Sequence, residues 1–128
     1  MMLVIGGNSQ GKLDYVKNIL NMTDDQINDG EFCVLEEAFQ KPVLNKLHLL
    51  VKRLMEADLD MMDVVVKGLE KNPAITVICD EIGCGIVPMK KVDREWREQV
   101  GRIQCIVAKK ADIVCRVYCS LPVMIKGE

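Results

Sequence analysis

The hydrophobic positions of this chain follow two spacings, one typical of buried strands and one typical of helices. Residues 2–5 form a short apolar run that ends at a glycine-rich turn, which predicts a buried strand. Residues 75–79 are apolar or β-branched at every position and predict the clearest strand in the chain. Further strands are predicted at residues 31–35, at residues 112–119 and, as a short edge strand containing a proline, at residues 121–126.

Between these runs the apolar residues recur every three or four positions, as on the inner face of a helix. This spacing predicts a helix over residues 11–21 and a long helix over residues 93–110, with Asp93 as a suitable N-cap. A helix that begins at Pro42 and another over residues 59–71 are predicted in the middle of the chain. The polar segment 23–30, rich in Asp and Asn, is predicted to be a loop.

The order of these elements predicts the fold class. Strands that alternate with helices are joined by crossover connections and lie parallel in the sheet. We therefore predict an α/β fold with a mostly parallel sheet and helices on both faces. The length suits one domain, residues 1–128, and no internal repeat or linker divides the pattern.

Composition and charge exclude several function classes. A hydrophobic fraction of 49% and a charged fraction of 28% are typical of a globular protein. The formal net charge is −2 and aromatic residues make up only 4%, so neither a basic field nor a stacking surface for nucleic acid is expected. No apolar run approaches the ~20 residues of a membrane span, and no signal peptide is apparent. We expect a cytoplasmic protein.

The six cysteines give no metal-binding spacing. Without an export signal they are expected to be reduced thiols, most of them acting as small core residues. The chain contains no Cys-x-x-Cys pair and a single histidine, His48, so a zinc site is not expected. His48 lies on the apolar side of its predicted helix and is expected to be buried and neutral. It is not expected to be a nucleophile.

The strongest chemical signal is a G-x-x-x-x-G-K sequence that follows the first strand and opens the first helix. Glycines allow successive backbone N–H groups to face phosphate oxygens, and the helix N-terminus and the lysine add positive charge. We predict a phosphate site here; the alternative is a tight turn between a strand and a helix. The predicted nucleotide-binding residues are Gly6, Gly7, Asn8, Ser9, Gln10, Gly11 and Lys12.

The residue after this motif argues against a complete catalytic loop. Phosphate loops that hold Mg²⁺ use a Ser or Thr hydroxyl at this position, and here the residue is Leu13. An isobutyl group cannot bind a metal, so magnesium must be held by other groups or is absent. The sequence therefore supports phosphate binding better than phosphoryl transfer.

Two acids follow the strand at residues 75–79. Asp80 and Glu81 are expected at the carboxyl ends of the strands, the same edge as the phosphate loop. There a carboxylate can bind magnesium or orient a nucleophile, and the alternative is an ordinary turn or cap residue. Glu36 and Glu37 follow the weaker second strand and are weaker candidates of the same kind.

The long C-terminal helix carries charges whose role is less specific. Arg94, Arg97 and Arg102 could contact a nucleotide, but charges along one flank of a helix are more often solvated. Trp96 belongs to the apolar stripe of this helix, so we expect it to pack in the core or at a subunit interface.

Two blocks of sequence resemble the adenosylcobinamide kinase/adenosylcobinamide-phosphate guanylyltransferase family of cobalamin assembly. Residues 3–12 are similar to its GG-x-x-SGKS loop, and residues 79–88 to its NEVGxGIVP motif. The second block continues through residues 93–104, similar to R-x-FRD-x-x-G-x-x-N/Q. Shorter matches lie at residues 111–112 and 121–123. Together they cover about half of the chain.

The resemblance implies a phosphate-loop NTPase-like fold that uses GTP or ATP with Mg²⁺. It implies phosphoryl transfer to the hydroxyl of adenosylcobinamide, then GMP transfer through a histidine-linked intermediate, often in a homotrimer. On this basis Lys12 and Glu81 are the predicted catalytic residues, and Glu81 is the predicted metal ligand.

The chain also departs from the family pattern. Leu13 replaces the magnesium-binding Ser, and Asp80 stands where Asn is usual. The segment that carries the guanylylated histidine, between the first helix and the second strand, is missing. We therefore predict a cobinamide-kinase-like, purine-nucleotide-binding protein without guanylyltransferase activity. The alternative is a non-catalytic, nucleotide-responsive or structural subunit.

Overall fold

One six-stranded sheet organises the part of the chain that the computed structural model describes, residues 1–82 and 90–127. Its strands are β1 (Met2–Gly6), β2 (Ile27–Asp29), β3 (Val43–Asn45), β4 (Thr76–Asp80), β5 (Ile113–Tyr118) and β6 (Leu121–Lys126). Their order across the sheet is β2-β3-β4-β1-β5-β6, and every neighbouring pair is parallel except the antiparallel β5–β6 pair. The predicted α/β fold with a mostly parallel sheet is confirmed.

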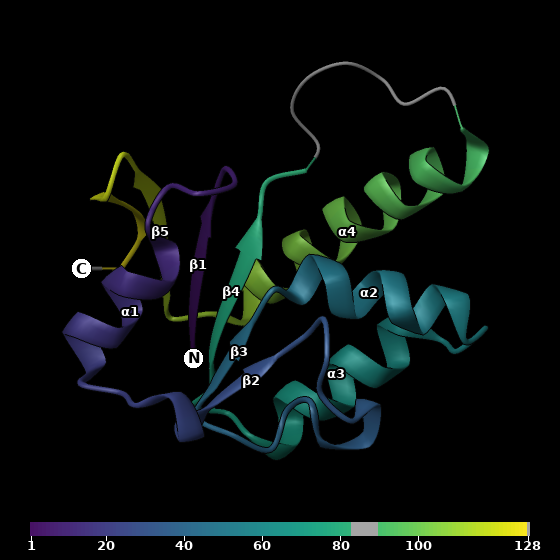
Figure 1. Cartoon of the computed structure of the whole chain (residues 1–128), viewed down its shortest axis with the longest axis horizontal. Coiled ribbons are helices and arrows are strands. Elements are labelled where there is room, and N and C mark those ends of the chain that lie inside the picture. Colours follow the sequence, from purple (N-terminus) through teal and green to yellow (C-terminus); the bar gives the residue numbers. More distant parts are fainter. Residues whose placement is uncertain (83–89, 128) are drawn as a thin grey trace.

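Helices cover both faces of the sheet, as predicted (Figure 1). Helix α1 (Lys12–Leu20) packs on one face through Val16, against the even-numbered side chains of β1. The other face is covered by α2 (Leu47–Glu56), α3 (Met61–Lys71) and α4 (Lys91–Lys110). Two short 3₁₀ turns, η1 (Asp24–Gln26) and η2 (Leu35–Glu37), complete the elements. No helix among the described residues is both long and apolar enough to span a membrane.

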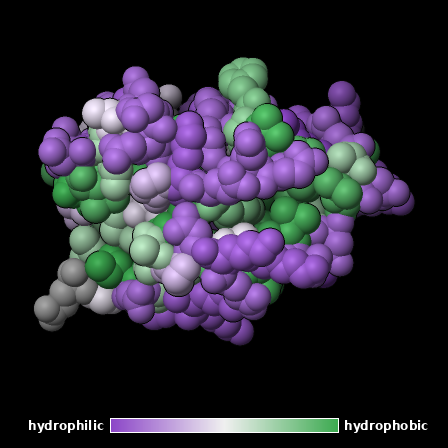
Figure 2. All heavy atoms as spheres, turned by 90° about the horizontal axis from the view of Figure 1, so that it is seen from below, coloured by the Kyte–Doolittle hydropathy of each residue, from purple (hydrophilic) through white to green (hydrophobic). Residues whose placement is uncertain are grey.

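The register of the central strands determines which side chains meet at their carboxyl ends. β1 lies between β4 and β5, with Gly6 opposite Asp80 and Ile5 opposite Arg116. In parallel α/β sheets this edge is where ligands bind. The opposite edge, where the strands begin, is covered mainly by hydrophilic side chains, with apolar residues showing between them (Figure 2).

The prediction of a strand at residues 31–35 is wrong. The second strand lies earlier in the chain, within the segment 23–30 that is predicted to be a loop. The sequence of β2, Ile-Asn-Asp, is mostly polar, so the hydrophobic pattern does not predict a strand there. Its central residue Asn28 is nevertheless buried, because its side-chain amide donates hydrogen bonds to the carbonyl groups of Glu37 and Ala38 at 2.7 and 3.2 Å. Two of the apolar residues that suggested a strand are exposed, Phe32 by 77% and Val34 by 56%, while Cys33 and Leu35 pack partly against the core.

The predicted helix from Pro42 is also wrong at its start. Val43 and Leu44 belong to β3 and point to opposite faces of the sheet, into the two separate cores. Leu44 happens to stand at helical spacing from Leu47, which made strand and helix look continuous. Lys46, with φ of +60°, separates them, and the helix begins at Leu47.

The remaining elements agree with the prediction apart from their ends. α3 begins two residues later than predicted, at Met61, after Asp60 caps it by accepting a hydrogen bond from the Asp63 N–H. α4 begins two residues earlier than predicted, so Asp93 is not its N-cap. Residues 83–88 of the block that resembles the NEVGxGIVP motif lie outside the described residues.

Candidate phosphate-binding site

The glycine-rich segment between β1 and α1 forms a tight loop, in the context that the sequence predicted. A Cβ atom on Gly6 would lie 2.5 Å from the carbonyl oxygen of Val117, so only glycine allows this approach to β5. Gly11 has φ of +90°, and a Cβ there would lie 2.6 Å from Oγ of Ser120. These two glycines are therefore required by the packing of the loop against the end of β5 and the turn that follows it.

The turn between β5 and β6 braces the loop through Gln10. The N–H of Cys119 donates to Oε1 of Gln10 at 2.7 Å, and the N–H of Ser120 donates to the Gln10 carbonyl group at 2.9 Å. Cys119 and Ser120 both have positive φ, as in the two-residue turns that close twisted hairpins. Gln10 is thus engaged by the hairpin, while Asn8 and Ser9 are exposed.

Lys12 turns back over the loop and is buried, with only 7% of its side chain exposed. Its ammonium group lies 2.7 Å from Oδ1 of Asp80 and donates a hydrogen bond of 2.6 Å to the carbonyl group of Gly7. A buried ammonium group needs such partners, because an unpaired buried charge is costly. The loop lysine is therefore held in a defined position by the end of β4.

His48 fixes the carboxylate that pairs with Lys12. The N–H of Asp80 donates to Nδ1 of His48 at 3.2 Å, and Nε2 of His48 lies 3.4 Å from Oδ2 of Asp80. Because Nδ1 accepts a hydrogen bond, the neutral imidazole carries its proton on Nε2, facing the carboxylate. His48 is 5% exposed, and burial lowers its pKa. The prediction of a buried histidine is confirmed, and the lowered pKa agrees with the predicted neutral form.

Glu81, the predicted metal ligand, pairs with an arginine from the neighbouring part of the sheet. Nε of Arg116 lies 2.8 Å from Oε1 of Glu81, and its Nη2 donates to Oε2 at 3.1 Å. The contact is an ion pair strengthened by one charge-assisted hydrogen bond, from Nη2 to Oε2. The backbone N–H of Glu81 donates to the Gly6 carbonyl group at 2.8 Å, so Glu81 sits beside the loop although its carboxylate is committed to Arg116.

A cavity of about 840 Å³ lies at the carboxyl edge of the sheet beside Lys12, His48 and Asp80. The glycine-rich loop lines one part of it, and Lys46 and Trp96 line another. Nζ of Lys46 lies 3.4 Å from both Asp29 Oδ2 and Glu31 Oε1. The wall is mixed in polarity, and its lining contains the acids Asp14, Glu31 and Asp80 as well as the two lysines. Its volume suits a ligand of nucleotide size.

Trp96 is positioned from two sides. Its indole N–H donates to the His48 carbonyl group at 2.8 Å, and the ammonium group of Lys52 lies 5.2 Å from the ring centre. The ring also packs against the main core, as predicted. Along the same helix Arg94 and Arg102 are exposed, and Arg102 pairs with Glu98 at 2.6 Å.

The residues present do not fit a magnesium ion of the kind that phosphate loops hold. Leu13 offers no oxygen in the first turn of α1 and packs against the core beneath it. Asp80 faces Lys12 and His48, and Glu81 faces Arg116. Within residues 1–82 and 90–127, no group of three His, Cys, Asp or Glu side chains is placed to hold a metal ion.

Sequence reasoning missed part of this site. Asp80 was considered together with Glu81, but the structure places Asp80, and not Glu81, against the loop lysine. No sequence pattern singles out Arg116. Its place beside the glycine-rich loop follows from its position opposite Ile5, which is known only once the order of the strands is known. Glu36 and Glu37 lie exposed on η2 and do not line the cavity, because the strand expected before them is absent.

Comparison with known proteins adds an independent finding. A family model described as cobinamide kinase / cobinamide phosphate guanyltransferase matches residues 33–125, more than half of the chain. This match contains His48, Asp80 and Glu81 and begins after the phosphate loop. A curated relative, the bifunctional adenosylcobalamin biosynthesis protein CobU of Salmonella typhimurium, is 31% identical over 68 residues. Those residues are 52% of this chain but only 38% of the relative.

Proposed function

The chain belongs to the cobinamide kinase / cobinamide phosphate guanyltransferase family, and we propose that it acts in cobalamin biosynthesis as a purine-nucleotide-binding protein. The nucleotide is ATP or GTP, with its phosphates in the loop formed by residues 6–12. The observation that carries this proposal is the buried ammonium group of Lys12, which pairs with Asp80 in the wall of a large cavity. A phosphate would receive that charge together with the N–H groups of the loop and of the first turn of α1.

Each residue of the proposed site has a separate task. When a phosphate binds, the Lys12 ammonium group leaves the Asp80 carboxylate and contacts phosphate oxygens, which are also anionic. Asp80, fixed by His48, keeps the ammonium group at the mouth of the loop while no phosphate is bound. Gly6 and Gly11 hold the loop in place, because a larger residue at either position would collide with β5 or the turn after it.

Titration calorimetry with ATP and GTP tests this assignment. Lys12→Ala should weaken binding by at least about tenfold, because a hydrogen bond to a charged group contributes roughly 1.5–3 kcal/mol. Lys17→Ala is the matched control, since Lys17 lies on the same helix and pairs with Asp24. The double variant Lys12→Ala/Asp80→Ala removes both charges together and guards against loss through misfolding. Equal affinity for all three variants and wild type would contradict the proposal.

Phosphoryl transfer to the hydroxyl of adenosylcobinamide is the activity that the family description suggests. A purified sample with ATP or GTP and adenosylcobinamide is assayed for phosphorylated corrinoid. Product that disappears with Lys12→Ala would establish a kinase. Nucleotide binding without product would favour the alternative, a nucleotide-responsive subunit without turnover. The pairing of Glu81 with Arg116 favours this alternative, because it engages the carboxylate predicted to assist the acceptor.

Guanylyl transfer is not part of the proposed function. The one histidine of the chain, His48, is buried with both ring nitrogens directed at Asp80. A nucleophilic nitrogen needs an accessible lone pair in line with the phosphorus atom. Incubation with radiolabelled GTP should therefore leave no acid-labile label on the protein, and a label lost in His48→Gln would contradict this.

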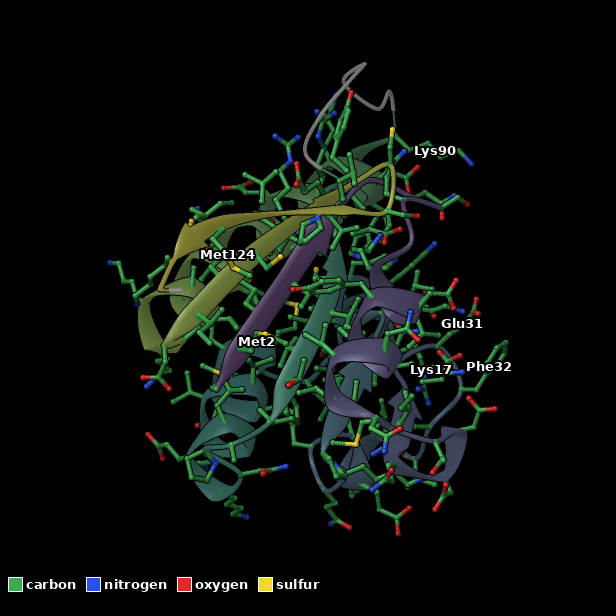
Figure 3. All side chains as sticks on the ribbon, turned by 90° about the vertical axis from the view of Figure 1, so that its left-hand side faces the viewer. Met2, Lys17, Glu31, Phe32, Lys90 and Met124 are labelled. Carbon is green, nitrogen blue, oxygen red and sulfur yellow. The ribbon has the colours of Figure 1, made fainter. Side chains whose placement is uncertain are left out.

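We also propose that the chain self-associates through β6. All six residues of this edge strand are exposed, among them Leu121 (67%), Val123 (53%) and Ile125 (59%). Figure 3 shows Met124 on this strand at one edge of the sheet, far from Glu31 and Phe32 at the other. An exposed apolar edge strand is a template for pairing with another chain.

Light scattering with size-exclusion chromatography tests this association. Wild type should form a defined homo-oligomer, a trimer by the family resemblance, and Val123→Lys should dissociate it. Val92→Lys is the control, because Val92 is equally exposed (64%) but lies on α4. A wild-type monomer at every concentration would contradict the proposal.

A further inference from the structure

Three positions beside the glycine-rich loop, 13, 80 and 81, are the ones expected to bear ligands for a metal ion. The first is apolar and the other two are acids paired with cations. In phosphate-loop proteins the residue after the loop lysine supplies a hydroxyl ligand to Mg²⁺, and an acid at the end of the neighbouring strand supports it. Here the first position is Leu13 and the second is Asp80. Leu13 packs partly against the core on the α1 side and also lines the cavity, so this position faces the site, but its isobutyl group offers no atom that could bind a metal.

Asp80 behaves as a counter-ion. Oδ1 lies 2.7 Å from the Lys12 ammonium group, and Oδ2 faces Nε2 of His48 at 3.4 Å. A phosphate that draws Lys12 away releases Oδ1 only, since His48 stays attached to the Asp80 backbone N–H through Nδ1. At most one oxygen of Asp80 then becomes available, and no hydroxyl stands beside it at position 13. The acid in the first turn of α1, Asp14, lines the cavity but is not the residue that follows the loop lysine.

Glu81 does not replace the missing ligand. Its carboxylate forms an ion pair with Arg116, whose Nε lies 2.8 Å from Oε1 and whose Nη2 donates a hydrogen bond to Oε2. The side chain of Glu81 is 16% exposed and that of Arg116 is 46% exposed, so water screens this pair in part. A divalent cation would have to displace the guanidinium group, which already neutralises the carboxylate.

We propose that this site binds its nucleotide as the free polyphosphate anion, without help from a divalent cation. The charge that a metal would supply comes from Lys12, supported by the loop N–H groups and the N-terminus of α1. The inference rests on the proposed nucleotide binding at this loop and names the ionic form of the ligand. Asp80 and His48 then serve to place Lys12, and neither acts on a metal.

Titration calorimetry of wild type with ATP and GTP, in excess EDTA and in excess MgCl₂, tests the proposal. The dissociation constants should agree within about threefold, because position 13 carries no oxygen and the Asp80 and Glu81 carboxylates are paired with cations. Binding that is tenfold or more tighter with Mg²⁺, or seen only with Mg²⁺, would overturn the inference but leave the nucleotide site intact. Absence of binding in both buffers by a folded protein would overturn the proposed function itself.

A second experiment tests whether a substitution at position 13 can make nucleotide binding depend on Mg²⁺. Leu13→Ser restores a hydroxyl beside the loop, and Leu13→Ala removes the same packing without adding an oxygen. Mg²⁺ should tighten nucleotide binding to Leu13→Ser but not to Leu13→Ala, with circular dichroism used to verify that both variants fold. Leu13→Ser that remains as indifferent to Mg²⁺ as wild type would contradict the role assigned to Leu13.

Discussion

The ammonium group of Lys12 lies 2.7 Å from Oδ1 of Asp80, although the two residues are far apart in the sequence. They meet because β4 lies directly beside β1, with Gly6 opposite Asp80. Both side chains are largely buried, so the pair is screened less than a surface pair. It keeps the loop lysine ready for an anionic ligand.

Breaking this pair should cost far more stability than breaking an exposed pair. Asp80→Ala leaves the buried ammonium group of Lys12 without its counter-ion and should lower the free energy of unfolding by about 3 kcal/mol. The double variant Lys12→Ala/Asp80→Ala should cost less than the sum of the single changes. Urea unfolding measures both quantities.

An exposed ion pair provides the control for these measurements on the Lys12 and Asp80 variants. Arg102 and Glu98 lie 2.6 Å apart on α4, with both side chains more than half exposed. Arg102→Ala should change the free energy of unfolding by less than about 0.5 kcal/mol. A similar small effect from Asp80→Ala would show that the Lys12–Asp80 pair is not a buried one in solution.

The loop glycines should tolerate no side chain. Gly6→Ala places a Cβ atom 2.5 Å from the Val117 carbonyl oxygen and should destabilise the fold by at least about 2 kcal/mol, with weaker nucleotide binding. Gly101→Ala is the matched control, because nothing lies within 4 Å of its Cβ position on α4. That variant should stabilise the protein by about 1 kcal/mol through helix propensity. Thermal melts compare the two, and an unaffected Gly6→Ala would mean that the loop is farther from β5.

Much of this loop could be predicted from the sequence, because its determinants are local. The apolar run of β1, the glycines and the periodicity of α1 lie within twenty residues and need no tertiary information. By contrast, the contact of Asp80 with His48 depends on the way α2 packs over the end of β4. Sequence reasoning had His48 buried and neutral, but could not tell what its ring nitrogens face.

The errors in the middle of the chain have the same physical origin. β2 and β3 are three residues long, too short for any periodicity to appear. Asn28 is polar, so the sequence predicts a loop residue; its burial depends on hydrogen bonds to the segment 37–38, which the sequence does not reveal. Phe32 is apolar, so the sequence predicts a buried residue, but apolar character alone does not determine burial and the side chain is exposed.

Stability should fall as the pH drops below about 6.5, the usual pKa of histidine. Burial lowers the pKa of His48; Asp80 opposes this shift, Lys12 and Lys46 add to it, and Glu31 opposes it weakly. In this range the unfolded chain binds a proton that the folded protein does not, so acid favours unfolding. Urea midpoints between about pH 5 and pH 7 should show the decline.

His48→Gln identifies the source of that decline. The variant should be less stable than wild type at pH 7 but nearly independent of pH in this window. The acids with lowered pKa values, Asp25 and Asp112, do not interfere, because they titrate below their usual value of 3.8. An unchanged slope in His48→Gln would assign the pH dependence to other groups.

The cysteines should divide into two reactivity classes. Burial raises the pKa of Cys79 to about 12, and Cys115 is buried as well, so neither should react with an aryl disulfide in the folded protein. Cys105 and Cys119 are exposed and should react rapidly. Peptide mapping by mass spectrometry in a Cys84→Ser background locates the labels. Rapid labelling of Cys79 would show that the core around β4 opens.

A crystal structure with a non-hydrolysable GTP or ATP analogue tests the central claim most directly. The account predicts phosphate oxygens on the N–H groups of residues 7–12 and the Lys12 ammonium group moved from Asp80 onto the phosphate. An analogue bound elsewhere, or a folded protein whose Lys12 stays on Asp80 at saturating nucleotide, would contradict it.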